Sequence, residues 1–374
     1  MHFLLSRLES LILGSPTRLI TLLIFCAFIK IGIWYIPNLE LSQALARYPF
    51  ANPFTDPKAH YLFWNWLSPF IAYMLGLKTW LRFFLLHLSF AVFFIGLFLW
   101  HIYHSLPKTD AQKSALLFFV LPVSGTAFFW VGPDALTLLL WVFAFISAKR
   151  ISLVLIVGWL LGMQHFEQSL CAALALLIGV TLSHSFKSAS VVSRRFCIAN
   201  LLGIIFGKIT LIAIVASYEI TVNAGRTVWL EEHFWVVLSQ FGFHFQLIVW
   251  STLGLGWLAI LKYCDQGKSA LALLIPLLGL ILLVPFVQDQ TRVLALVSFP
   301  LLFNFVLFNP RFLNTVSTTQ ASLFFLLWLI LPWGWVFAGR TQGSVLSYDM
   351  VNLLHRLFGW FTVPEIRDYW PFYW

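Results

Sequence analysis

Five short polar segments interrupt an otherwise apolar chain, and each carries side chains that could do chemistry. They are Asn52–Tyr61 (with Asp56, Lys58 and His60), Gly132–Leu136 (with Asp134), Met163–Gln168 (with His165 and Glu167), Glu219–His233 (with Arg226) and Val287–Val293 (with Asp289 and Arg292). Carboxylates act as general bases or metal ligands, and Arg, Lys and His bind anionic groups. Because ionisable groups beside apolar helices are costly, these residues are the first candidates for a function.

Asp56 has two interpretations of equal weight. Its carboxylate could take a proton from an acceptor hydroxyl or hold a divalent metal ion. It could equally be a loop residue that begins a turn before Pro57.

Asp134 also has a structural and a functional interpretation. Pro133 lacks the N–H that the first turn of a helix leaves unused, and the Asp134 carboxylate suits the positive end of the helix dipole, so the pair fits a helix start. In the functional interpretation, Asp134 adds a second carboxylate to the membrane face that carries Asp56.

Two further segments favour function over structure. Met163–Gln168 concentrates polar side chains between two apolar runs, where a structural hairpin would more cheaply use Gly, Ser or Asn. At the other segment, Arg292 could make a bidentate contact with a phosphate. Alternatively, Asp289 could pair with Arg292 at i to i+3 on a helix.

Lys208 lies near the middle of an apolar run, unlike most charges in the chain. It either snorkels toward the membrane surface or faces a polar cavity. The middle of a span is where snorkelling is hardest, so the second interpretation stays open.

The composition identifies the elements that must position these residues. The 374 residues are 60% hydrophobic and 10% charged, against about 25% charged in soluble domains. Apolar runs close to the ~20 residues that cross a bilayer predict an all-α integral membrane protein, a polytopic bundle of about eleven transmembrane helices. The runs are Leu19–Ile36, Phe83–Tyr103, Ala115–Val131, Ala135–Ala148, Ile151–Met163, Ser169–Leu182, Phe196–Tyr218, Phe234–Leu261, Ala270–Val287, Val293–Phe308 and Ala321–Ala338.

One further apolar stretch, Tyr61–Leu77, decides the topology. If it does not cross the membrane, most loop Lys and Arg residues fall on the side of the N-terminus, which the positive-inside rule makes cytoplasmic. We therefore expect a single transmembrane domain over 1–374, with residues 1–18 cytoplasmic. In this layout the first outer loop (37–82) contains an amphipathic helix at Tyr61–Leu77, and the 341–374 tail lies on the outer membrane surface.

Several classes of protein are excluded by what the chain lacks. The net charge of +9 is dispersed between apolar runs, not gathered in a basic stripe, so no nucleic-acid partner is expected. The chain contains no GxxxxGK[ST] phosphate loop, no HExxH zinc helix and no GxSxG nucleophile elbow. Its four cysteines are far apart, and we interpret them as inert thiols.

The layout of the first ~180 residues resembles that of the GT-C superfamily of membrane glycosyltransferases. Members have many spans, a large first outer loop with an acidic residue (here Asp56) and an amphipathic helix after it (here Tyr61–Leu77). They carry a second acidic residue in the next outer loop, here Asp134 in Gly132-Pro133-Asp134-Ala135-Leu136. The chain departs from many members because its first loop lacks paired acidic residues and because it shows no soluble C-terminal domain.

The resemblance implies transfer of a sugar from a polyprenyl-phosphate-linked donor to an acceptor hydroxyl on the extracytoplasmic face. The acceptor would be a glycan, a lipid or a protein. The catalytic residues would be Asp56 as the first choice of base, followed by Asp134 and Glu167. The substrate and phosphate ligands would be Lys58, His60, His165, Arg226, Asp289 and Arg292. No cofactor is required, and a divalent Mg²⁺ or Mn²⁺ ion held by Asp56 and Asp134 stays open.

Two other functions remain as alternatives. A polysaccharide polymerase or ligase of the O-antigen type would use the same donors, with Arg226 and Arg292 in its outer loops. A lipid or solute transporter would line a path through the bundle with charges, whereas the polar residues here concentrate on one face. The compact layout leads us to expect the bacterial inner (plasma) membrane, with membrane lipids as neighbours.

Overall fold

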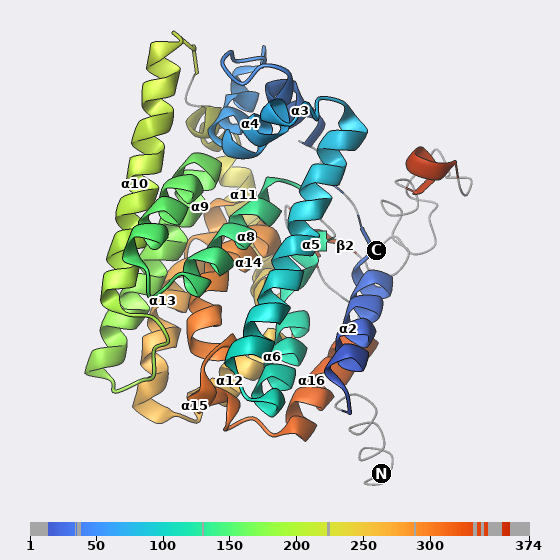
Figure 1. The fold of residues 1–374 in the computed structure, drawn as a ribbon, viewed down its shortest axis with the longest axis vertical. Helices are drawn as coiled ribbons and strands as arrows, with labels where there is room; N and C mark the ends of the chain where they lie inside the picture. Colours follow the sequence, from blue (N-terminus) through green and yellow to red (C-terminus); the bar gives the residue numbers. More distant parts are fainter. Residues whose placement is uncertain are drawn as a thin grey trace.

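The computed structural model is almost entirely helical (Figure 1). It describes residues 14–33, 35, 39–128, 131–222, 225–287, 289–331, 335–337, 340–342 and 354–359. In chain order the longer elements are α2 (Pro16–Ile31), α3 (Leu39–Arg47), η1 (Pro57–Trp64), α4 (Leu67–Met74), α5 (Trp80–Ser105), α6 (Lys108–Val120), α7 (Pro122–Phe128), α8 (Pro133–Ile146), α9 (Ile151–Ser185), α10 (Arg194–Ser217), α11 (Gly225–Leu253), α12 (Gly256–Cys264), α13 (Leu271–Ile281), α14 (Gln290–Leu302) and α16 (Thr318–Ile330). Short turns and strands complete the list: η2 (Gly267–Ala270), η3 (Val284–Phe286), the π-helical η4 (Phe303–Leu307), α15 (Pro310–Leu313), β1 (Trp335–Phe337) and β2 (Arg340–Gln342).

Six of the described helical segments are long and apolar enough to cross a membrane. They are Trp80–Ser105, Ile151–Ser185, Arg194–Ser217, Glu231–Leu253, Gly267–Phe286 and Gln290–Leu307. The membrane class is thus supported, but the expected count of about eleven spans is not confirmed. Two of the expected runs are broken. Pro122 separates α6 from α7, and Gly254, at φ 52°, separates α11 from α12.

A glycine seam joins the first half of α9 to α10. Gly158 lies against the Asn200 backbone, so closely that an added Cβ would collide with the Asn200 carbonyl. Four residues later, Gly162 lies against the Ile204 backbone in the same way. Residue numbers increase in the same direction along both helices, from the Gly158–Asn200 contact to the Gly162–Ile204 contact, so this half of α9 runs parallel to α10. Small residues let membrane helices approach closely and gain van der Waals contact.

α9 must fold back on itself at His165, whose backbone is non-helical (φ −158°, ψ 74°). Residues 186–193 join the end of α9 to the start of α10 and can bridge at most about 28 Å. A straight α9 lying parallel to α10 would leave a gap of roughly 50 Å for that linker. The reversal agrees with the hairpin expected between the Ile151–Met163 and Ser169–Leu182 runs.

Residues 39–74, which we call the cap, lie together at one end of the bundle, where Figure 1 shows α3 and α4. Gln43 donates to the Lys78 carbonyl at 2.7 Å, so the chain leaves the cap beside α3, without having crossed the bundle. The expected amphipathic helix at Tyr61–Leu77 is not confirmed. That stretch divides into the end of η1 and α4, and it buries Phe63 and Leu67. In α3, buried and exposed positions do alternate with a helical period.

The opposite end of the bundle, which we call the base, is formed by residues 147–150, 186–193, 263–270 and 308–317. Asn309 donates to the Ala189 carbonyl at 3.1 Å, and the Ser188 and Tyr263 hydroxyls are 3.1 Å apart. The base therefore gathers the loops that the charge pattern places on one membrane side, and the cap lies at the other end.

A short helical turn at residues 354–358 is attached beside the start of the cap. Arg356 donates to the Tyr35 hydroxyl at 2.7 Å and to the Glu40 carboxylate at 2.5 Å, and its guanidinium lies 4.0 Å from the Trp80 ring centroid. This part of the tail lies at the cap end, and its position on the outer membrane surface stays a prediction. The rest of the 341–374 tail lies outside the described residues, apart from 341, 342 and 359.

Candidate functional site

A buried ion cluster joins α8 to α14 beneath the cap. Arg292, in the first turn of α14, donates through Nη1 to Asp134 Oδ2 at 2.6 Å and through Nε to Asp289. The Asp134 side chain is 1% exposed and that of Arg292 is 19% exposed. Two carboxylates therefore engage one guanidinium. The attraction of each carboxylate to the guanidinium offsets part of the cost of burying the three charges.

His165 brings the reversal of α9 into this cluster. Its Nε2 lies 4.0 Å from Asp134 Oδ1, and its side chain is 4% exposed. The non-helical backbone at this residue turns the chain where the side chain meets Asp134. With His165 neutral the group carries one excess negative charge, and protonation of the imidazole would balance it.

Gln164, the neighbour of His165, ties the cluster to the cap. Its amide oxygen accepts from the Ser68 backbone N–H at 2.9 Å, and its amide nitrogen donates to the Pro133 carbonyl at 2.9 Å. The start of α4, the start of α8 and the tip of α9 are thereby held at one point. Nothing in the spacing of the sequence identified this role for Gln164.

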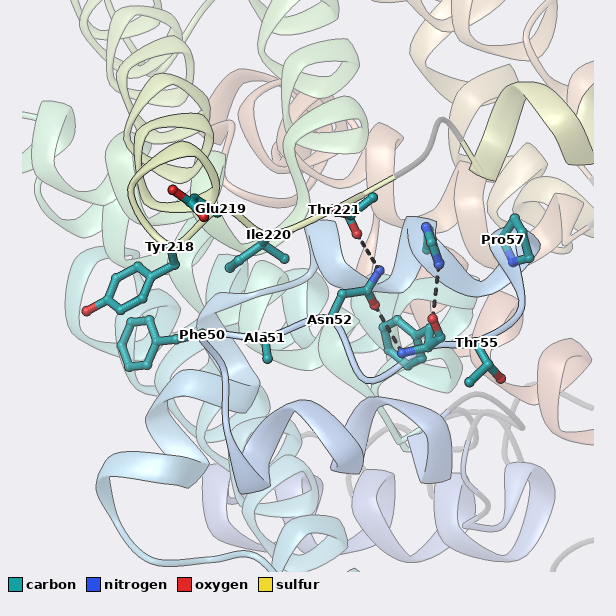
Figure 2. A pocket seen from close by; sticks show the side chains of 11 residues that line it. Phe50, Ala51, Asn52, Thr55, Pro57, Tyr218, Glu219, Ile220 and Thr221 are labelled. Atoms are coloured by element: carbon teal, nitrogen blue, oxygen red, sulfur yellow. Dashed lines mark hydrogen bonds between the residues drawn. The ribbon is translucent and has the colours of Figure 1, made fainter.

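A separate hollow of about 450 Å³ opens on the cap, between the 50–57 loop and the end of α10 (Figure 2). The Phe50 and Tyr218 rings stack at 4.6 Å at one end. Asn52 donates to the Thr221 carbonyl at 2.8 Å and so bridges the two walls. Figure 2 shows Thr55 on the far side of Asn52 from the stacked rings. Aromatic side chains beside a few polar groups are a common lining of small-ligand pockets.

His60 lines this hollow, and Asp56 lies in the same loop, away from the ion cluster. Thr55 and Pro57 line the hollow, and exposed Asp56 lies between them in the chain. Buried His60 has its Nε2 3.0 Å from the Phe54 carbonyl oxygen, where the ring braces the loop. The structure thus divides the predicted residues between two places.

The ion cluster brings together four of the predicted site residues: Asp134, His165, Asp289 and Arg292. Of the two alternatives for Arg292, the structure shows the i to i+3 pairing with Asp289, and phosphate binding by Arg292 stays a prediction. Glu167 is half-buried in the second limb of α9, one residue after Phe166. The side chains of Lys58 and Arg226 lie outside the described part of the chain.

Lys208 is explained by tertiary contacts that the sequence did not reveal. Its ammonium lies 3.5 Å from the centroid of the Trp64 ring in η1 and 5.3 Å from that of Phe166 in α9. A cation over an aromatic face is attracted by the ring quadrupole. The mid-span lysine therefore reaches the underside of the cap.

The divalent metal ion that the sequence left open is not located by the structure. In the described ranges, no three His, Cys, Asp or Glu side chains gather closely enough to hold a metal ion. Asp134, one of the two proposed ligands, is engaged by Arg292 instead.

The chain as a whole was also compared with family models, with curated proteins and with solved structures, and none of the three comparisons finds a match.

Proposed function

We propose that this protein is a membrane glycosyltransferase that moves a sugar from a polyprenyl-phosphate-linked donor to an acceptor hydroxyl at the cap end. The observation that carries the proposal is the hollow on the cap, with the Phe50 and Tyr218 rings at one end and Thr55 and Pro57, the chain neighbours of Asp56, in its lining. A sugar ring presents apolar C–H faces and hydroxyl groups together. Such a ligand matches a lining of aromatic and polar side chains.

Asp56 acts as the general base in this proposal. Asp56 is exposed and lies between Thr55 and Pro57, which both line the hollow, and the proposal requires its carboxylate to reach a hydroxyl bound there. General bases must lie within hydrogen-bond reach of the proton that they remove. Asp134 does not meet this condition, because it is 1% exposed and bonded to Arg292. Its role is to hold α8, α9 and α14 in place beneath the cap.

Sugar transfer in reconstituted vesicles tests the proposal. The vesicles would contain the protein and a pool of radiolabelled polyprenyl-phosphate sugars, and the label would be followed into glycan, lipid and protein fractions. We expect transfer by the wild type and a loss of about a hundredfold or more in Asp56→Asn. Asp265→Asn is the matched control, because Asp265 is exposed at the base and pairs only locally with Lys262.

The outcomes separate the activity from the assigned base. No transfer from any donor would overturn the proposed function. Transfer that survives Asp56→Asn would keep the function and move the base elsewhere, with half-buried Glu167 next in line. A ladder of repeat units, instead of a single added sugar, would identify a polymerase.

A transporter is the second candidate, and one observation favours it. The ion cluster of Asp134, His165 and Arg292 lies inside the bundle, where buried charges mark proton and substrate pathways. The charge pattern of the sequence had indicated that the polar residues lie on one face. Flux of labelled lipid or solute across the same vesicles, with no sugar transferred, would favour this candidate over the enzyme.

A further inference from the structure

Glu219 lines the hollow at the end where the Phe50 and Tyr218 rings stack, as Figure 2 shows. Among the described residues of this lining, Glu219 alone has an Asp, Glu, Lys or Arg side chain. It is exposed, and within the described ranges its carboxylate has no hydrogen-bond or ion-pair partner. The described walls therefore present one carboxylate to a ligand and no cation that would neutralise it.

The backbone at Glu219 has a conformation that seldom suits a glutamate. The residue follows the end of α10 with φ 50°, in the left-handed region. Its N–H donates to the Ala216 carbonyl at 3.2 Å, and the Ile220 N–H donates to the Val215 carbonyl at 2.9 Å, which is the pattern of a Schellman turn. Glycine or asparagine usually occupies this position, because a larger side chain is strained there. The negative end of the helix dipole also repels a carboxylate.

Lys187 shows that the turn alone does not explain the carboxylate. It is the only other non-glycine residue with a positive φ in the described part of the chain, at 53°, and it follows the end of α9 at the base. The Ser188 N–H donates to the Ser183 carbonyl at 2.9 Å, so the turn is of the same kind. A lysine suits the negative end of a helix, whereas a glutamate does not. Local rules are broken most often at functional sites, and Glu219 breaks two of them in the lining of a hollow.

The residues around Glu219 suit a cationic ligand. Tyr218 is 52% exposed, and an aromatic face attracts a cation through the ring quadrupole. A carboxylate binds an ammonium through charge-assisted hydrogen bonds, which are about twice as strong as neutral ones. Asn52 and Thr55 add neutral polar side chains to the same lining. A molecule that carries an ammonium beside hydroxyl groups would complement all of these features.

We propose that the hollow binds an acceptor sugar with a positively charged amino group, whose ammonium is held by the Glu219 carboxylate and the Tyr218 ring. This inference rests on the proposed function and names the class of acceptor, an amino sugar. A bound cation would also remove the repulsion at the end of α10. In the transfer, the bond between the donor sugar and the phosphate breaks as the bond to the acceptor oxygen forms. The acceptor hydroxyl gives its proton to Asp56, and the polyprenyl phosphate leaves.

Binding of two simple sugars tests the ammonium site without any need for catalysis. The probes are methyl glucosaminide and methyl glucoside, which differ only in the ammonium or hydroxyl group on one ring carbon. Wild-type protein in nanodiscs of neutral lipid would be titrated with each at mildly acidic pH, where the amino group is protonated, and binding would be followed by saturation-transfer NMR. We expect the wild type to bind the glucosaminide about fivefold or more tighter than the glucoside.

Variants at the two turns separate recognition from folding. Glu219→Gln keeps the size of the side chain and removes its charge, so the preference for the glucosaminide should fall below about twofold. Glu219→Gly relieves the strained backbone, and it should lose the preference while unfolding at the same temperature as the wild type or a higher one. Lys187→Gly is the matched control, because it changes the same kind of turn at the base and should leave the preference unchanged.

The outcomes distinguish the site from the proposed function. Equal affinity of the wild type for the two probes would overturn the inference, even if the wild type transfers sugar. A preference that survives in both Glu219 variants would overturn the role of this residue. Equal competition from ethanolamine would overturn the assignment to a sugar. A Glu219-dependent preference without sugar transfer from any donor would sustain the ammonium site and count against the proposed function alone.

Discussion

The two ends of the bundle both bury charged side chains, and they neutralise them in different ways. At the base, Lys113 and Asp110 lie one turn apart on α6 with a 3.5 Å separation, and Lys113 also donates to the Leu313 carbonyl at 2.9 Å. At the cap end, Asp134 and Arg292 come from helices that are far apart in the chain, and His165 comes from a third element.

This difference separates local from tertiary stabilisation. A pair at i to i+3 forms wherever its helix forms, so the charges at the base depend on little beyond α6 and its neighbour. At the cap end the Asp289–Arg292 pair is also local, but the contacts of Asp134 with Arg292 and His165 exist only when α8, α9 and α14 are correctly packed. Buried ion pairs contribute little net stability, but a broken one leaves an uncompensated charge. We therefore expect the cap end to be far more sensitive to substitution.

Arg292→Met should have the largest effect, because it leaves Asp134 and Asp289 buried without their guanidinium. We expect a loss of about 3–5 kcal/mol in the free energy of unfolding. Reversible unfolding in mixed detergent and SDS micelles would measure it. The double variant Asp134→Asn/Arg292→Met should recover part of the loss. Wild-type stability in the single variant would show that the cluster contributes nothing.

Gly207→Ala should come next, because it disturbs the α9–α10 seam that runs between the two ends. An added Cβ would collide with the Trp159 carbonyl oxygen, so the helices must separate. We expect a loss of about 1–3 kcal/mol by the same unfolding measurement. Gly96→Ala in α5 is the control, because nothing lies within 4 Å of its added Cβ. Equal stability of the two variants would contradict the close seam.

Lys113→Met tests the base directly. The substitution removes the bond to the Leu313 carbonyl and the partner of Asp110. We expect a loss of about 1–2 kcal/mol, clearly smaller than that of Arg292→Met. If the two losses are equal, the contrast between the two ends of the bundle is wrong.

Arg356→Ala should have the smallest effect. Arg356 and Glu40 are 45% and 46% exposed, and exposed ion pairs contribute roughly 0–1 kcal/mol. Limited proteolysis after residue 342 would show whether the tail stays attached to the cap. We expect faster cleavage in the variant with nearly unchanged global unfolding, and a large change in unfolding would show that the tail is part of the core.

The sequence predicted the helical membrane class, and it separated the Ile151–Met163 and Ser169–Leu182 runs near His165. It assigned Asp134, His165, Asp289 and Arg292 to one membrane face without predicting that they meet. The membrane class could be predicted because hydropathy acts over whole segments. The sequence did not predict the breaks at Pro122 and Gly254, since both lie inside continuous apolar runs. Nor did it reveal the cap hollow, which depends on Phe50 stacking on a residue far along the chain.

Composition and spacing by themselves determined that this chain is a bundle of apolar helices with its polar segments at the ends. In lipid the backbone must satisfy its own hydrogen bonds, so apolar runs of this length have few other options. The tertiary structure decided which charges pair. It placed Arg292 on two carboxylates and Lys208 on the Trp64 ring, and it left Asp56 at the surface. Such pairings depend on how helices distant in the chain pack together, and no local pattern records that packing.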